Sequence, residues 1–225
     1  MSSDPKHRDE APSTRAGAVA VIVFARAPVP GLAKTRLIPA LGAQGAAALA
    51  QRMLEHAVAV ACDAGIGPVE VCATPDGSHP VFDALRSRHR VDVIEQGEGD
   101  LGARMNRALV RALTRAPAAI LFGTDLPDLD VHAVRSAATA LKDHDAVFVP
   151  ALDGGYGLVG LRRPAPTLFR DIPWSTSEVM PTTRARARSI GLRVAELAPV
   201  ADIDEPGDLD CVPIEWLPDA NVAHP

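Results

Sequence analysis

Short apolar, β-branched runs alternate along this chain with longer stretches of helix-forming residues, and this alternation is what most constrains the fold. The runs that predict strands are Val19–Phe24, Val69–Ala73, Val91–Ile94, Ala119–Phe122, Ala146–Val149, Tyr156–Leu161 and Leu192–Leu197. The stretches that predict helices are Gly45–Ala64, Pro80–Arg88, Leu101–Arg115, Val131–Lys142 and Ser177–Ile190. This pattern predicts an α/β three-layer sandwich with a mixed, mainly parallel sheet of about seven strands.

The ends of the chain differ in composition from its middle. Residues 1–16 are polar and lack an apolar period, so we expect a disordered tail there. Residues 17–212 are expected to form a single domain, followed by an irregular C-terminal extension over 213–225. The longest apolar run, Ala16–Ala25, is too short to span a bilayer, and three cysteines do not suggest a disulfide framework. We therefore expect a cytoplasmic protein without membrane insertion.

The charge balance argues against a nucleic-acid partner. The chain has 23 basic and 28 acidic residues, a formal net charge of −5. Seven of the acidic residues, and no Lys or Arg, lie after Val200. A protein whose main task is to neutralise nucleic-acid phosphates would carry the opposite excess. The acidic excess is therefore concentrated in the C-terminal segment.

The loop after the first predicted strand combines stiff backbone with cations. Prolines and Gly31 turn the chain, and Lys34 and Arg36 follow directly. Backbone N–H groups followed by Lys and Arg suit a diphosphate or triphosphate. The alternative is a proline-stiffened surface loop with solvated cations. The Walker A pattern is not present in this loop.

A glycine pattern follows the third predicted strand. Gly97, Gly99 and Gly102 match the dinucleotide-binding fingerprint in spacing. However, Glu98 and Asp100 place two carboxylates in a loop that would have to hold a pyrophosphate. The two carboxylates therefore disfavour a dinucleotide site here, and the glycine spacing alone is a weak signal for one.

Aspartates stand after the later strands. Asp125 comes directly after a buried strand and is placed to hold a divalent ion against phosphate oxygens, or simply to cap a turn. Asp153 begins an Asp-Gly-Gly-Tyr segment that is either a hairpin turn or a close approach to a ligand. Asp202 and Asp204 would point to the same side of an extended segment and could share a metal, or Asp204 could cap a helix.

Six motifs together resemble one bacterial family of GT-A-fold transferases. That family is labelled radical-SAM/selenodomain-associated transferase or arsenosugar-biosynthesis glycosyltransferase, and it is distantly similar to nucleotidyltransferases that make molybdenum-cofactor dinucleotides and a guanylylated phospholactate. The motifs occur in the family's order and cover about Ala18 to Asp210: APVPGLAKTRL, GDLGARM, GTDLPDL, the stretch from Pro150 through DGGYGLVGL, PWST and DIDEPGDL.

The resemblance implies roles for individual residues. Gly31, Lys34 and Arg36 would hold the nucleotide phosphates, and Asp125 would be the metal aspartate. Asp204 resembles the second metal aspartate of the nucleotidyltransferases, ahead of Asp202. The remaining implied contacts are Gln96, Gly99 and Arg104 on the nucleotide side, and Asp153, Gly154, Gly155, Tyr156 and Trp174 on the sugar or acceptor side.

The expected function is a transfer reaction that depends on Mg²⁺ or Mn²⁺. In the first hypothesis a nucleotide sugar donates its glycosyl group to a small-molecule acceptor, with Lys34, Arg36, Asp125 and Asp153 as the catalytic residues. In the alternative, an NTP condenses with a phosphorylated small molecule and releases pyrophosphate. A third hypothesis is a nucleotide-binding module without turnover.

Overall fold

The computed structural model describes residues 18–217. The predicted tail over 1–16 and the end of the predicted extension over 213–225 lie outside the described residues. The apolar runs form one seven-stranded sheet in the order β3-β2-β1-β4-β6-β5-β7. Its strands are β1 (Val19–Arg26), β2 (Val69–Thr74), β3 (Asp92–Glu95), β4 (Ala118–Gly123), β5 (Ala146–Pro150), β6 (Tyr156–Leu161) and β7 (Val194–Glu196).

The strand directions confirm the mixed, mainly parallel sheet predicted from the sequence. β1 pairs in parallel with β2 and β4, and β5 pairs in parallel with β7. β6 is antiparallel to both of its neighbours, β4 and β5. β6 therefore inserts between two strands that run the same way, and the carboxyl ends of the other strands all meet at one edge of the sheet.

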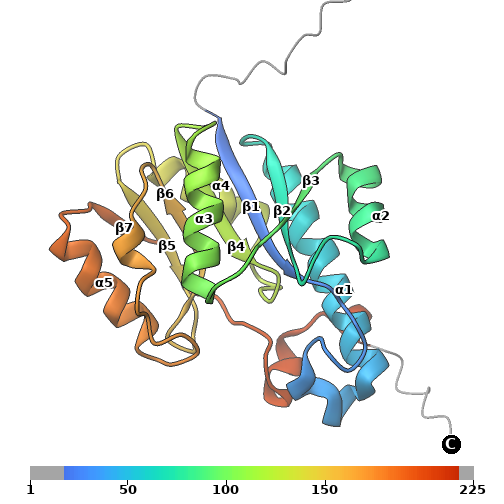
Figure 1. Ribbon diagram of the computed structural model, residues 1–225. Helices are drawn as coiled ribbons and strands as arrows, with labels where there is room; N and C mark the ends of the chain where they lie inside the picture. The colour runs from blue at the N-terminus through green and yellow to red at the C-terminus, as the bar shows by residue number, and fades with distance from the viewer. Residues whose placement is uncertain (1–17, 218–225) are drawn as a thin grey trace, which may run out of the picture.

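Helices cover both faces of the sheet (Figure 1). The α-helices are α1 (Ile38–Ala64), α2 (Pro80–His89), α3 (Leu101–Leu113), α4 (Val131–Ala140) and α5 (Val179–Ser189). Side chains of α1, α2 and α4 share one apolar core with the sheet, and side chains of α3 and α5 share the other. This arrangement confirms the three-layer sandwich.

The first helix begins earlier than the sequence predicts. The expected start was Gly45, whereas α1 is assigned from Ile38. Gly42 has φ +67°, outside the helical region, so it separates a short first turn from the long helix that follows. Leu54 and Val58 of the long part are buried against the sheet. The apolar period therefore located the part of α1 that packs on the core.

Local sequence signals explain where other helices begin. Asp100 caps α3 by accepting a hydrogen bond of 2.7 Å from the backbone N–H of Ala103. Asp130 caps α4 in the same way, with a bond of 2.8 Å from Ala133. Asp130 is thus the residue that marks the start of α4.

The segment after β7 returns to the carboxyl edge of the sheet. It contains two 3-10 helices, η3 (Pro206–Cys211) and η4 (Ile214–Trp216). Ile203 and Val212 from this segment are buried together with Leu49 and Met53 of α1. Figure 1 shows this segment beside the loop that follows β1. Two stretches from opposite ends of the chain therefore border the same edge.

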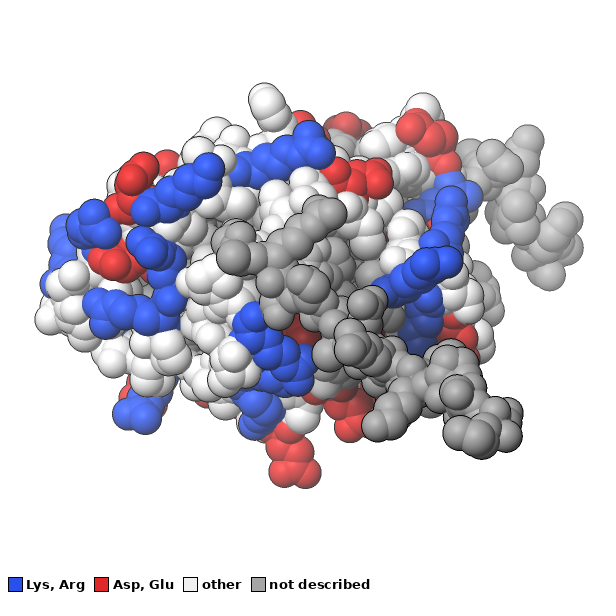
Figure 2. Space-filling view, turned by 90° about the horizontal axis from the view of Figure 1, so that it is seen from above, with Lys and Arg blue, Asp and Glu red and all other residues white. Residues whose placement is uncertain are grey.

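The opposite end of the molecule is mixed in charge. Figure 2 views the end where the parallel strands begin, and Lys and Arg side chains lie beside Asp and Glu over the surface that grey atoms leave visible. Among residues 18–217, no helix is both long and apolar enough to cross a membrane.

Candidate active site

A cleft opens beyond the carboxyl ends of the parallel strands. Its cavity volume is about 670 Å³, which is the size of a site for a small ligand. Most of the residues predicted to form a site line it: Lys34, Arg36, Gln96, Arg104, Asp125, Asp153, Gly155, Tyr156, Trp174, Asp202 and Asp204. The cleft is not lined by Gly31, Gly99 or Gly154, although each lies in a loop that contributes to it.

The loop after β1 presents Lys34 from a strained backbone conformation. Lys34 has φ +46° and ψ +48°, which lie in the left-handed region that residues other than glycine rarely adopt. The buried side chains of Ala33 and Leu37 anchor the loop on both sides of it. Such strain persists only where the surroundings compensate for it.

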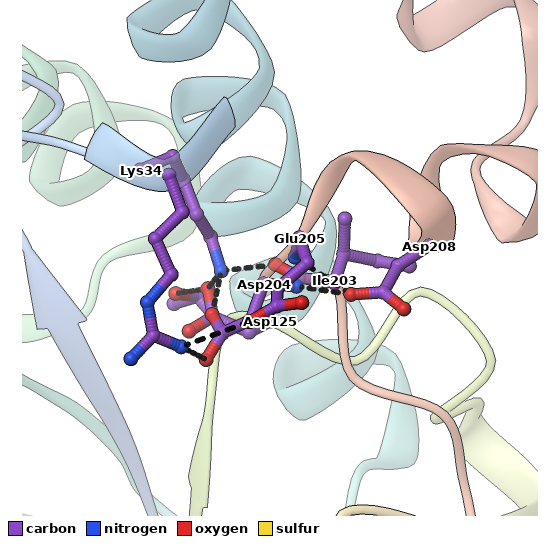
Figure 3. A network of polar contacts seen from close by, with 8 residues as sticks. Lys34, Asp125, Ile203, Asp204, Glu205 and Asp208 are labelled. Carbon is purple, nitrogen blue, oxygen red and sulfur yellow. Dashed lines mark hydrogen bonds and ion pairs between the residues drawn. The ribbon is translucent and has the colours of Figure 1, made fainter. Parts of the chain in front are cut away.

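The Lys34 ammonium lies between two carboxylates (Figure 3). Its Nζ atom is 2.9 Å from Asp125 Oδ1 and 2.9 Å from Asp204 Oδ1. It also donates to the backbone oxygen of Ile203. Burial lowers the pKa of Lys34, but the two carboxylates more than reverse this, so its pKa is raised overall. Lys34 is therefore charged at neutral pH.

Backbone contacts bring the second carboxylate to this place. The N–H of Ile203 donates a 3.0 Å hydrogen bond to the backbone oxygen of Asp125. Asp208 accepts from the backbone N–H groups of Asp204 at 2.9 Å and Glu205 at 2.7 Å. Because Ile203 is fully buried, Asp202 and Asp204 on either side of it both face the cleft. This confirms the predicted alternation, whereas the helix cap is Glu205 and not Asp204.

Arginines stand around the same cleft. The Arg36 guanidinium is exposed and lies 3.9 Å from carboxylate oxygens of Asp204 and Glu205. Arg104 donates from Nε to the backbone oxygen of Gly99 at 2.7 Å, which holds its guanidinium beside the cleft. Arg26, at the end of β1, also lines the cleft. These three side chains offer forked donors for phosphate oxygens.

Gly102, the last glycine of the pattern, lies in the first turn of α3 and serves the packing of the chain itself. A Cβ atom on Gly102 would lie 2.1 Å from the backbone oxygen of Phe169, so α3 can approach that segment only with glycine here. Gln96 is buried, and its side-chain nitrogen donates to the backbone oxygens of Cys72 at 3.0 Å and Ala25 at 3.3 Å. Gln96 thus ties neighbouring strand ends together at the floor of the cleft.

Asp153 and two aromatic residues also line the cleft. Asp153 Oδ1 accepts a 2.7 Å hydrogen bond from the N–H of Gly155, as a turn residue does. The rings of Tyr156 and Trp174 meet edge to face with centroids 6.2 Å apart. Burial raises the pKa of Tyr156, so its hydroxyl keeps its proton. Burial and the nearby Asp153 carboxylate also raise the pKa of Asp202.

Residues 57–176, more than half of the chain, match the family model described as "Uncharacterized protein conserved in bacteria (DUF2064)". The chain belongs to the DUF2064 family. No curated protein matches this DUF2064 chain.

Solved structures share the fold of this DUF2064 chain. A "putative nucleotide-diphospho-sugar transferase" from Desulfovibrio desulfuricans G20 is 28% identical, with a TM-score of 0.77, over 84% of this chain and 83% of that one. The 4-diphosphocytidyl-2C-methyl-D-erythritol synthase of Anaerococcus prevotii is 9% identical, with a TM-score of 0.57, over 87% and 96%. Rv0371C of Mycobacterium tuberculosis, in complex with manganese, is 18% identical, with a TM-score of 0.51, over 83% and 92%. The last two likenesses concern the fold alone.

The donors in the DUF2064 cleft suit a hard divalent cation. Mg²⁺ binds through one or two carboxylates and completes its shell with waters and substrate phosphates. Asp125 and Asp204 supply two carboxylates that are 44% and 48% exposed. Among the described residues no group of three or more His, Cys, Asp or Glu side chains is arranged to hold a metal. The pair therefore fits a cation shared with phosphate, and Lys34 contacts one oxygen of each carboxylate.

Several residues that line the DUF2064 cleft were missed in the sequence. Arg26 follows the apolar run of the first strand. Its position at the carboxyl end of a strand could therefore have predicted that it borders the site. Ser175 lines the cleft with φ +63°, a backbone conformation that its sequence neighbours do not reveal. Met105 and Phe24 also line the cleft, but in the sequence their apolar side chains predict ordinary core positions. Only the tertiary fold distinguishes them.

Proposed function

We propose that this chain transfers a glycosyl group from a nucleotide-diphosphate sugar to a small-molecule acceptor, with Mg²⁺ or Mn²⁺ as cofactor. The observation that carries the proposal is one cleft that combines Lys34 and three arginines with Asp125 and Asp204. Cations and a carboxylate-held metal together suit a diphosphate leaving group. Similarity to the Desulfovibrio protein described as a nucleotide-diphospho-sugar transferase supports the same reaction.

The cationic side chains would bind the donor. Arg26, Arg36 and Arg104 line the cleft and would direct N–H groups toward phosphate oxygens, and Gly31 and Gly99 belong to the loops that lead to Arg36 and Arg104. Gln96 would close the floor of the nucleotide side. A divalent cation on Asp125 and Asp204 would supply charge neutralisation for the departing diphosphate.

The acidic and aromatic side of the cleft would bind the acceptor. Gly154 and Gly155 shape the turn that carries Asp153, and the rings of Tyr156 and Trp174 pack against each other among the residues that line the cleft. Asp153 Oδ2 would accept the proton of an acceptor hydroxyl, since Oδ1 is held by Gly155. The hydroxyl oxygen then bonds to the sugar carbon, and the bond from that carbon to the diphosphate breaks.

Nucleotidyl transfer is the second candidate. One observation favours it: Oδ1 of Asp125 and Oδ1 of Asp204 both contact Lys34 Nζ, so the two carboxylates lie close together. The resemblance to nucleotidyltransferases implies that Asp204 is a second metal aspartate beside Asp125. In that reaction a phosphorylated substrate attacks the α-phosphate of an NTP, and pyrophosphate leaves. The family resemblance also suggests a narrower function, that of an arsenosugar-biosynthesis glycosyltransferase. This narrower proposal specifies the acceptor of the glycosyl group.

A product assay separates the two reactions. The full chain is incubated with Mg²⁺ or Mn²⁺ and a panel of NTPs and of UDP-, GDP- and dTDP-sugars. Nucleoside diphosphate released from a nucleotide sugar supports glycosyl transfer, and pyrophosphate released from an NTP supports nucleotidyl transfer. Metal-dependent nucleotide binding with neither product would contradict both and leave a binding module.

A further inference from the structure

Lys34 uses its full capacity for contacts inside the protein. An ammonium group has three N–H bonds. Lys34 Nζ contacts three oxygens: Oδ1 of Asp125 and Oδ1 of Asp204, each at 2.9 Å, and the backbone oxygen of Ile203. Its side chain is only 8% exposed. In this arrangement Lys34 has no N–H group left for a phosphate oxygen.

The backbone is built to hold the ammonium there. Lys34 is a non-glycine residue at φ +46°, a conformation that persists only when other contacts compensate for it. The N–H of Leu37 donates a 2.9 Å hydrogen bond to the Lys34 carbonyl oxygen and fixes the turn. The two ion pairs are therefore part of what holds this loop in place.

The ammonium and a divalent cation require the same oxygens. Hard divalent cations bind oxygen ligands at short distances, and the available pair is Asp125 and Asp204. A cation close to both carboxylates would stand next to Lys34 Nζ, and like charges so close repel. It is therefore unfavourable for Lys34 Nζ and a metal ion to contact Oδ1 of Asp125 and Oδ1 of Asp204 at the same time.

We propose that Lys34 is the resident counter-ion of the Asp125–Asp204 pair and competes with a divalent cation for it. Nucleotide phosphates would draw the ammonium away, so cation and nucleotide bind cooperatively. This inference deepens the proposed function. Only the cooperative binding of cation and nucleotide rests on that function. The competition itself concerns this chain and the cation alone.

The free protein and Mn²⁺ provide the first test. Binding of Mn²⁺ without nucleotide is measured by the electron paramagnetic resonance signal of the free ion, for wild type, Lys34→Met and Lys34→Gln. We expect both variants to bind Mn²⁺ tighter than wild type by about 5- to 150-fold, the usual range of coupling between sites. Equal affinities in wild type and folded variants would overturn the proposal.

Arg36→Met is the matched control for loss of a positive charge. Arg36 lies 3.9 Å from Asp204 Oδ2 and its side chain is 63% exposed. Its removal should change Mn²⁺ affinity by about twofold, well below the effect of Lys34→Met, because exposed ion pairs are weak. An effect as large as that of Lys34→Met would mean that net charge, not occupancy of the site, controls binding, and would overturn the proposal.

Stability gives a readout that does not depend on any nucleotide. Circular dichroism establishes that each variant is folded, and Mn²⁺ should raise the Tm of Lys34→Met and Lys34→Gln more than that of wild type. Equal Tm shifts would contradict the competition.

UDP, GDP and GTP provide the cooperative arm. Each nucleotide that binds should increase the Mn²⁺ affinity of wild type more than that of Lys34→Met, because the variant has no ammonium to displace. Equal increases would overturn the coupling. If neither these three nucleotides nor any NTP or nucleotide sugar of the product assay binds while Lys34→Met still binds Mn²⁺ tighter, the competition holds and the proposed function fails.

Discussion

The backbone N–H of Ile203 donates a 3.0 Å hydrogen bond to the backbone carbonyl oxygen of Asp125. This bond joins the segment after the last strand to the loop after β4. It sets Asp204 beside Asp125, so one lysine contacts both carboxylates. The candidate site therefore depends on how firmly Ile203 is seated.

Replacement of Ile203 tests this dependence. Ile203 is fully buried, so Ile203→Ala should lower the free energy of unfolding by about 2–5 kcal/mol. Turnover should fall as well, because Asp204 would lose its fixed position. Urea unfolding and the product assay measure the two effects. Ile214→Ala is the control, since Ile214 is 80% exposed, and it should leave both unchanged. A fully active Ile203→Ala protein would argue against the role of this contact.

The carboxylate of Asp125 should be needed for reaction but not for folding. Asp125→Asn keeps the shape of the side chain and removes the charge, so metal-dependent turnover should fall by about 100-fold or more. Asp128→Asn, in the same loop, is the control, because Asp128 is exposed and does not line the cleft. Near-normal activity of folded Asp125→Asn would refute the metal assignment.

Gly102 should resist any larger side chain. In Gly102→Ala the new Cβ atom would lie 2.1 Å from the backbone oxygen of Phe169, which forces α3 to shift. The gain in helix propensity is about 1 kcal/mol, whereas overpacking costs about 1–3 kcal/mol, so we expect a net loss of stability. Gly207→Ala, where the added carbon meets nothing within 4 Å, should be neutral by the same thermal unfolding measurement.

His56 should make stability depend on pH. Burial lowers the pKa of His56 below its ordinary value of 6.5, and the backbone of Pro127 offsets this only in part. The unfolded chain then binds the proton more tightly, so the free energy of unfolding falls as pH decreases through that value. Between about pH 7.5 and about pH 5.5, wild type should lose more stability than His56→Gln. His132→Gln, at an exposed position, should follow wild type.

The cysteines should differ sharply in reactivity. Cys211 is exposed, whereas Cys72 is buried and burial raises its pKa to about 12. Since only the thiolate reacts, a disulfide reagent at pH 8 should modify Cys211 first and leave Cys72 intact in the folded protein. Cys211→Ser should abolish the fast phase. A fast phase that survives in this variant would show that another thiol is accessible.

Local patterns were sufficient for the layers of the fold but not for the order of its strands. The alternation of apolar runs located every strand to within a few residues, and Tyr156–Leu161 agrees at both ends. A hairpin turn was one of two alternatives for the segment that begins at Asp153, and β5 and β6 run antiparallel on either side of it. However, β6 lies between β4 and β5, and that insertion is decided by packing across the sheet, which no local period encodes.

The candidate site shows the same limit. Strand ends pointed to Lys34 and Asp125 separately, since ligands gather at the carboxyl edge of such sheets. The contact of Lys34 with Asp125 and Asp204 was not predicted, because it depends on a turn with positive φ and on the return of the C-terminal segment. The sequence predicted that Lys34 binds phosphate and that Asp125 and Asp204 bind a metal. In the structure, the ammonium of Lys34 contacts both carboxylates.

The position of Asp204 along the chain also has a consequence for biosynthesis. The strands β1 to β7 all precede it, so they are synthesised before the second carboxylate exists. A chain interrupted after β7 would contain the loop of Lys34 and Asp125 yet lack the partner that Ile203 brings. The ribosome must therefore translate through Asp204 before the paired carboxylates can form, which ties their appearance to a late stage of synthesis.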